Sequence, residues 1–139
     1  MAFTRWLTPL ALAALLPGLA SAGRQGPARP AVEAWLGVFE AGPERVALVW
    51  TDEGLRLELG QVAVPVDGQW HETVPTFFVR HRATWVATRH VIEVEEQHNL
   101  GALWRFELRH EVSGRRLLKV APAAGGNPER VLRTLLRVR

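Results

Sequence analysis

Two long segments in which apolar and polar residues alternate constrain the fold of this chain more than any other feature. The first is Trp85–Glu95 and the second is Leu103–Val112. A period of two places successive side chains on opposite faces of a β-strand, so each segment predicts a strand with one buried and one solvated face. Because the residues between them, QHNLG at 97–101, suit a turn, we predict an antiparallel hairpin.

The register of this hairpin follows from its turn. Matching Glu96 with Ala102 across the turn places Ile92 opposite Phe106 on the apolar face. The same register places Glu93 opposite an arginine, Arg105, which is a favourable cross-strand pair.

Four further segments carry strand patterns. Leu55–Leu59 and Val62–Val66 alternate on either side of a glycine, which predicts a second hairpin. Leu117–Val120 follows a tight turn. The C-terminal segment Val131–Arg139 fits either a helix or a strand. We predict a strand, because the sheet begun by the two long strands would gain a partner.

Three segments predict helices. In Ala31–Ala41, apolar residues recur at i, i+3, i+4 and i+7, which is the spacing of one helix face. A second helix is predicted from Pro43 to the acidic turn at 51–54. A third follows the cap and proline at 73–75 and runs to about Ala83, where an edge strand is the competing interpretation.

This order of elements resembles the α+β cone shared by nuclear transport factor two, ketosteroid isomerase and the polyketide-cyclase-like proteins. AVEAWLGVFEAG at 31–42 resembles the first helix of that family, and WTDEGLRL at 50–57 resembles the junction after its second helix. VPVDG at 64–68, followed by Phe77 and Phe78, resembles the loop and third helix. The resemblance implies N-terminal helices packed in a strongly curved antiparallel sheet, an apolar pocket, and a homodimer through the outer sheet face. An all-β meander barrel is the alternative fold.

The first 22 residues predict a secretory signal peptide. A short basic region, an apolar stretch at 6–19 and the cleavage motif ASA at 20–22 follow one another. The apolar stretch is shorter than the ~20 residues that a spanning helix needs and is interrupted by proline and glycine, so we predict no stable membrane span. Residues 23–30 are then a flexible tether, and 31–139 form one domain that is exported to the periplasm or outside the cell.

Composition excludes several classes of function. The chain has 17 basic and 14 acidic side chains, a balance without the basic stripe that nucleic acid requires. It has no cysteine, so the domain must be held by its core alone. It also has no tyrosine, the oxyanion donor of ketosteroid isomerases, which argues against that mechanism. No phosphate loop or metal motif is present, and no cofactor is predicted.

The predicted hairpin makes His90 and His110 diagonal neighbours on the apolar face, with backbones about 7–8 Å apart. Two neutral imidazoles there could bind a transition metal or relay a proton. The competing interpretation is structural, with each ring bonded to a nearby backbone carbonyl. A metal would need a third ligand, for which Glu96 and His71 are candidates. Asp52, at the predicted helix-to-strand junction, is the remaining catalytic candidate.

Aromatic side chains predict a pocket for a flat or apolar ligand, although large rings also simply fill cores. The members of this predicted pocket are Trp35, Phe39, Phe77, Trp85, Trp104 and Phe106. The leading hypothesis is an exported domain that binds a small apolar molecule or a protein partner without catalysis. The alternatives are a cyclase, isomerase or hydrolase that uses the pocket histidines, and an all-β envelope binding or inhibitor module.

Overall fold

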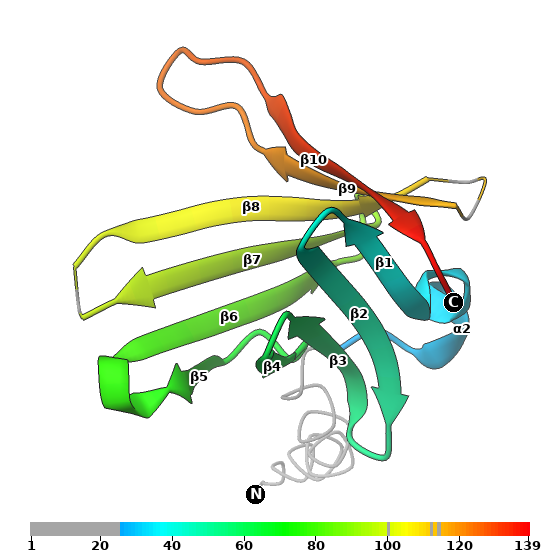
Figure 1. Cartoon of the computed structure of the whole chain (residues 1–139), viewed down its shortest axis with the longest axis horizontal. Helices are drawn as coiled ribbons and strands as arrows, with labels where there is room; N and C mark the ends of the chain where they lie inside the picture. The colour runs from blue at the N-terminus through cyan, green and yellow to red at the C-terminus, as the bar shows by residue number, and fades with distance from the viewer. Residues whose placement is uncertain (1–25, 100, 112, 114) are drawn as a thin grey trace, which may run out of the picture.

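The computed structural model describes residues 26–99, 101–111, 113 and 115–139. The predicted signal peptide and most of the tether therefore lie outside the described residues. In the part that is described, ten strands follow one another around a nearly closed antiparallel barrel (Figure 1). The strands are β1 (Gly37–Ala41), β2 (Glu44–Thr51), β3 (Gly54–Leu59), β4 (Val62–Pro65), β5 (Trp70–Val74), β6 (Val79–Val86), β7 (Val91–His98), β8 (Leu103–His110), β9 (Arg116–Ala121) and β10 (Arg130–Arg137).

In the described residues, three short helical elements accompany the strands. The helix α2 (Arg29–Val32) and the 3-10 turn η2 (Glu33–Trp35) precede β1, and the 3-10 turn η3 (Pro75–Phe77) joins β5 to β6. No helix in the described residues is long and apolar enough to cross a bilayer.

The barrel is closed by the two ends of the domain. The strand order is β4-β3-β2-β1-β10-β9-β8-β7-β6-β5, so β1 pairs with β10. Val38 N–H donates to the carbonyl of Arg139 at 2.6 Å. The remaining gap lies between β4 and β5, where Val66 forms a bridge with Ala83 and narrows the opening. The sheet therefore exposes little unpaired edge.

The α+β cone is wrong, and the all-β meander barrel is the correct alternative. The segments predicted as the first two helices contain β1 and β2, and the third is η3 followed by β6. Helical spacing is real only as far as Trp35, because Gly37 takes a φ of +145° and begins an extended strand. In β2, Val46 and Leu48 belong to the hydrophobic core cluster, whereas Ala47 between them is buried but lies outside that cluster, as the strand period requires.

The other strand predictions are confirmed in type. The hairpin of β3 and β4, the strand β9 and the C-terminal strand β10 are all present. The first long predicted strand is in fact two, since β6 ends at Val86 and β7 begins at Val91.

The predicted register between the two long strands is wrong by two residues. Ile92 pairs with Leu108 rather than Phe106, and Arg105 faces Glu95 rather than Glu93. A shift of two residues leaves the side chains within β7 and β8 on their predicted faces, because the strand period is two.

One end of the barrel is closed by the helical segment at 29–35. Val32 and Trp35 are buried and pack against the inward side chains of the strands. Figure 1 shows α2 beside the start of β1 and the C-terminus. The largest fully buried strand side chains are Phe39, Leu48, Leu57, Ile92, Leu108, Leu117 and Leu135.

Candidate functional site

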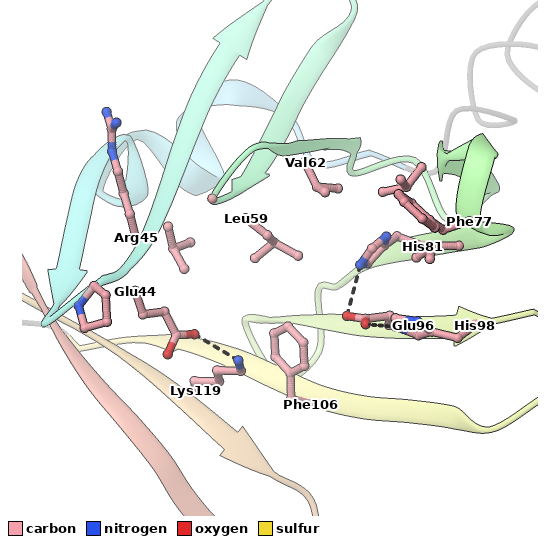
Figure 2. A pocket seen from close by; sticks show the side chains of 15 residues that line it. Glu44, Arg45, Leu59, Val62, Phe77, His81, Glu96, His98, Phe106 and Lys119 are labelled. Carbon is pink, nitrogen blue, oxygen red and sulfur yellow. Dashed lines mark hydrogen bonds and ion pairs between the residues drawn. The ribbon is translucent and has the colours of Figure 1, made fainter.

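At the end of the barrel opposite the helical segment, the interior contains a cavity of about 660 Å³ (Figure 2). Most of the residues that line it lie on the halves of the strands that point away from the helical segment. The apolar wall is formed by Val46, Leu59, Val62, Val74, Phe77, Val79 and Phe106. The polar wall is formed by Glu44, Arg45, His81, Glu96, His98 and Lys119. The cavity is therefore amphipathic.

The placement of large rings explains why only one half of the barrel is hollow. At the closed end, Trp35 packs edge-on against Trp85 and stacks on His110, with ring centroids 5.7 and 5.4 Å apart. At the open end, most inward apolar positions carry valine or leucine. Because the interior of a barrel widens with strand number, ten strands lined by small side chains leave space that an eight-stranded barrel would fill.

His81 is the centre of a hydrogen-bonded chain on the polar wall. Its side chain is only 5% exposed. Nδ1 lies 2.6 Å from Thr73 Oγ1, and Nε2 lies 3.1 Å from Glu96 Oε1. Both ring nitrogens therefore have a hydrogen-bond partner, and the Thr73 hydroxyl also lies 3.4 Å from the carbonyl oxygen of Val79. The second oxygen of Glu96 meets His98 Nε2.

Glu96 is held as a carboxylate. Burial would raise the pKa of Glu96, but the hydrogen bond from His98 and the charge and hydrogen bond of His81 outweigh it and hold this pKa below its ordinary value of 4.5. The side chain remains partly exposed. Since each carboxylate oxygen accepts more than one hydrogen bond, Glu96 can also accept a donor from a ligand.

Lys119 places a cation on the opposite side of Phe106 (Figure 2). Its Nζ lies 2.9 Å from Glu44 Oε2 and 4.6 Å from the centroid of the Phe106 ring. An ammonium group has three donors, and Glu44 occupies one of them. The cavity thus presents an ammonium and a carboxylate on either side of an aromatic ring.

The predicted aromatic pocket is divided between the two ends of the barrel. Phe77 and Phe106 line the cavity. Trp35, Phe39 and Trp85 belong to the closed end, where Trp35 and Phe39 are buried. The sixth member, Trp104, is 62% exposed at the start of β8, with its backbone opposite Glu96.

The predicted histidine pair lies away from the cavity. His110 stacks on Trp35, whereas His90 is exposed in the turn after β6 and packs edge-on against Trp85 at 5.2 Å. The two imidazoles therefore contact different tryptophans. Asp52 lies in the exposed turn between β2 and β3.

The two candidates for a third metal ligand also lie apart. His71 bonds to Asp67, with Nε2 2.9 Å from Oδ2, and Glu96 belongs to the chain around His81. In the described residues no group of three or more histidine, aspartate or glutamate side chains is arranged to hold a metal ion.

Sequence reasoning missed His81, His98 and Lys119, and it considered Glu96 only as a metal ligand. A signal for His81 was present, because Val79, His81 and Ala83 alternate and all three are buried in β6. The predicted helix at 73–83 obscured that alternation. Lys119 carried no distinguishing signal, since a lysine in a strand normally faces solvent.

A second hollow lies on the outer face of β6, β7 and β8, beside the segment at 121–124. Its charged side chains are paired with one another. Glu95 accepts hydrogen bonds from Arg82 Nε at 2.7 Å and from Arg105 Nε at 3.0 Å, and Glu107 accepts from Arg89 and Arg109. Such a self-satisfied network stabilises the sheet and leaves few free groups for a ligand.

This outer network predicts a pH dependence of stability. Burial would raise the pKa of Glu95, but the hydrogen bonds and charges of Arg82 and Arg105 hold it below the ordinary value of 4.5. As pH falls below 4.5, the unfolded chain therefore takes up a proton before the folded chain does. The stabilisation is fully present above that value and is lost as pH falls through the folded pKa.

We expect Glu95→Gln to flatten the fall of the unfolding free energy below pH 4.5, measured from urea midpoints at a series of pH values. Arg105→Gln should flatten it in the same direction, because it removes one of the two arginines. An unchanged slope in both variants would contradict the assignment.

Comparison with known proteins identifies neither a family nor a function for the chain. No protein-family model, no curated protein and no solved structure matches the chain. The choice of function therefore depends on the geometry and chemistry of the cavity.

Proposed function

We propose that the protein is an exported all-β binding module that holds a small amphipathic molecule in the open half of its barrel. The observation that carries this proposal is the cavity of about 660 Å³ beside a packed, closed half. Small-molecule sites typically have volumes of roughly 300–1,000 Å³, with apolar walls and a few convergent polar groups. The cavity has both properties.

The polar wall supports an amphipathic ligand rather than a purely apolar one. Burying charged groups costs free energy, and replacing them with packed apolar residues is often neutral or stabilising. Lys119 and Glu96 nevertheless point to the cavity from β9 and β7. Their arrangement suits a ligand whose apolar part contacts Val62 and Phe106 while its polar group bonds to one or both charges.

The same geometry favours binding over catalysis. A general base needs a lone pair within reach of the substrate proton. In His81 both ring nitrogens are already bonded within the protein, Nδ1 to the Thr73 hydroxyl and Nε2 to the Glu96 carboxylate, so neither is free to take a substrate proton. The enzyme hypothesis that used His90 and His110 loses its support, because those residues lie outside the cavity. Export and the predicted homodimer stay predictions.

Filling the cavity should abolish binding. Val62 lines the cavity from β4, and the larger ring of tryptophan at this position would occupy its space. We expect Val62→Trp to raise the dissociation constant of a fluorescent amphipathic probe, anilinonaphthalene sulfonate, by about tenfold or more, equivalent to about 1.4 kcal/mol. Fluorescence titration of the folded protein measures the change.

The matched control is Ala63→Trp, because Ala63 is the next residue of β4 and is exposed. It adds the same ring outside the barrel and should leave probe affinity unchanged. Equal affinity in wild type and both variants would contradict the assigned cavity. Native mass spectrometry of the purified protein would identify a retained natural ligand.

A further inference from the structure

Four large apolar side chains are exposed at the same end of the barrel as the cavity, and one of them, Phe77, also lines it. Phe77 is 70% exposed, Phe78 66%, Leu103 44% and Trp104 62%. Phe77 and Phe78 belong to the β5–β6 turn, and Leu103 and Trp104 directly follow the β7–β8 turn. We call these four residues the mouth patch. Figure 1 places both turns at the same end of the barrel, away from α2. On the surface of a soluble protein such residues are normally scattered singly. Four of them at one end of the barrel therefore indicate a surface that binds a partner.

The mouth patch is built on a connected support. Asn99 N–H donates to the carbonyl of Phe78 at 2.8 Å, which joins the β5–β6 turn to the β7–β8 turn. Two residues further along the same pair of strands, Arg80 Nε donates to Gln97 Oε1 at 2.9 Å. These bonds hold the two turns side by side.

The backbone at Phe78 is unusual for an exposed aromatic residue. Its φ of 53° and ψ of 41° lie in the left-handed region, where bulky side chains are rare. Glycine or asparagine would fit this turn with less strain, as Asn99 does in the neighbouring turn with a φ of 51°. The local backbone thus gives no reason for a phenylalanine, which points to a role for the ring itself.

Basic side chains flank the mouth patch. The guanidinium of Arg80 lies 4.4 Å from the centroid of the Trp70 ring and bonds to the neutral amide of Gln97, so these contacts do not neutralise its charge. Arg105 follows Trp104 and is 64% exposed, although one edge binds Glu95. Aromatic rings beside arginines suit an anionic lipid surface, because the rings enter the interface while the cations meet headgroups.

We infer that the mouth patch docks on a lipid bilayer that carries anionic headgroups. Tryptophan and phenylalanine favour the boundary between headgroups and acyl chains. Phe77 both lines the cavity and belongs to the mouth patch, so docking would place the cavity opening against the bilayer. This inference goes beyond the proposed function, and it provides a route by which an amphipathic molecule could pass between membrane and barrel.

The test uses Phe78→Asn combined with Trp104→Gln, because neither residue lines the cavity and asparagine suits the left-handed turn. We expect wild-type protein to sediment with phosphatidylcholine vesicles that contain phosphatidylglycerol, and less with pure phosphatidylcholine. The double variant should bind about tenfold more weakly or worse, since two interfacial rings are lost. Added salt should weaken the wild-type interaction.

The matched control is Leu136→Gln combined with Val138→Gln, which removes two exposed apolar side chains at the C-terminal end of the chain. It should bind vesicles as wild type does. Equal vesicle binding by the two double variants, or none by wild-type protein, would overturn the inference. A wild-type dimer that only the mouth variant dissociates, without vesicle binding, would assign the patch to a second copy and also overturn it. Val62→Trp separates the two proposals, because it should lose the probe and keep vesicle binding.

Discussion

Replacing Phe39 with alanine is expected to lower the free energy of unfolding by about 3–5 kcal/mol. Phe39 is fully buried in β1, the strand that closes the barrel against β10. Its ring packs edge-on against His110 at 6.1 Å and lies under the guanidinium of Arg137 at 4.7 Å. The loss would be a large part of the roughly 5–15 kcal/mol that stabilises a typical domain.

Urea unfolding followed by tryptophan fluorescence measures this loss, and Phe77→Ala is its control. Phe77 carries the same ring but is 70% exposed, so its removal should change stability by only about 0.5 kcal/mol. A loss below about 1 kcal/mol for Phe39→Ala would show that the closed end repacks easily.

Phe39 matters because the closed end connects the two termini of the domain. Arg137 donates from its guanidinium to the carbonyls of Leu36 and Ala34, at 2.6 and 2.5 Å. These bonds link β10 to the end of the helical segment that covers the barrel. The closed end thus supplies packing and hydrogen bonds that stabilise the barrel, while the open end contains the cavity and the exposed aromatic rings.

The sequence predicted those strands whose patterns are long or bounded by turn residues. Apolar and polar residues alternate over β8, and over β3 and β4 on either side of Gly60, and this pattern fits a strand but not a helix. The register of β7 and β8 was less constrained. Arg105 faces an acid whether it lies opposite Glu93 or Glu95, so the charges could not distinguish two registers that differ by one strand period.

The strand β1 could not be predicted from local pattern, because its residues fit two periods. Val32 and Trp35 do share a helical face, and Phe39 continues their helical spacing. What makes Phe39 part of a strand is pairing on both sides, with Val46 of the next strand and with Arg137 at the far end of the chain. Strand pairing between distant segments regularly overrides local preference in this way.

The cavity could not be predicted either, because its polar residues are brought together by strand pairing. His81 meets Glu96 only because β6 and β7 pair in a register that places these two residues opposite one another. Lys119 reaches Glu44 only once β9 and the start of β2 lie on the same barrel wall. Side chains that meet only through strand pairing or across the barrel leave no short motif in the sequence.

Gly37→Ala is the second substitution for which we expect a large effect. Gly37 has a φ of +145°, a conformation that residues with a Cβ rarely adopt. An added Cβ would lie 2.5 Å from the carbonyl oxygen of Arg139 and would overlap the guanidinium of Arg137. The same carbonyl accepts the hydrogen bond from Val38. Alanine would therefore separate β1 from the C-terminus, and we expect a loss of about 3 kcal/mol from strain and overpacking.

Gly42→Ala is the matched comparison for that loss. Gly42 follows the other end of β1 with a φ of +59°, and no atom lies within 4 Å of an added Cβ. Its replacement should cost only the left-handed conformation, about 1–2 kcal/mol. The remaining difference between the two variants, measured from urea midpoints, combines the contact with the C-terminus and the greater backbone strain of alanine at a φ of +145°. Equal losses would show that the contact of Gly37 with Arg139 does not constrain β1, and that closure depends on the paired strands alone.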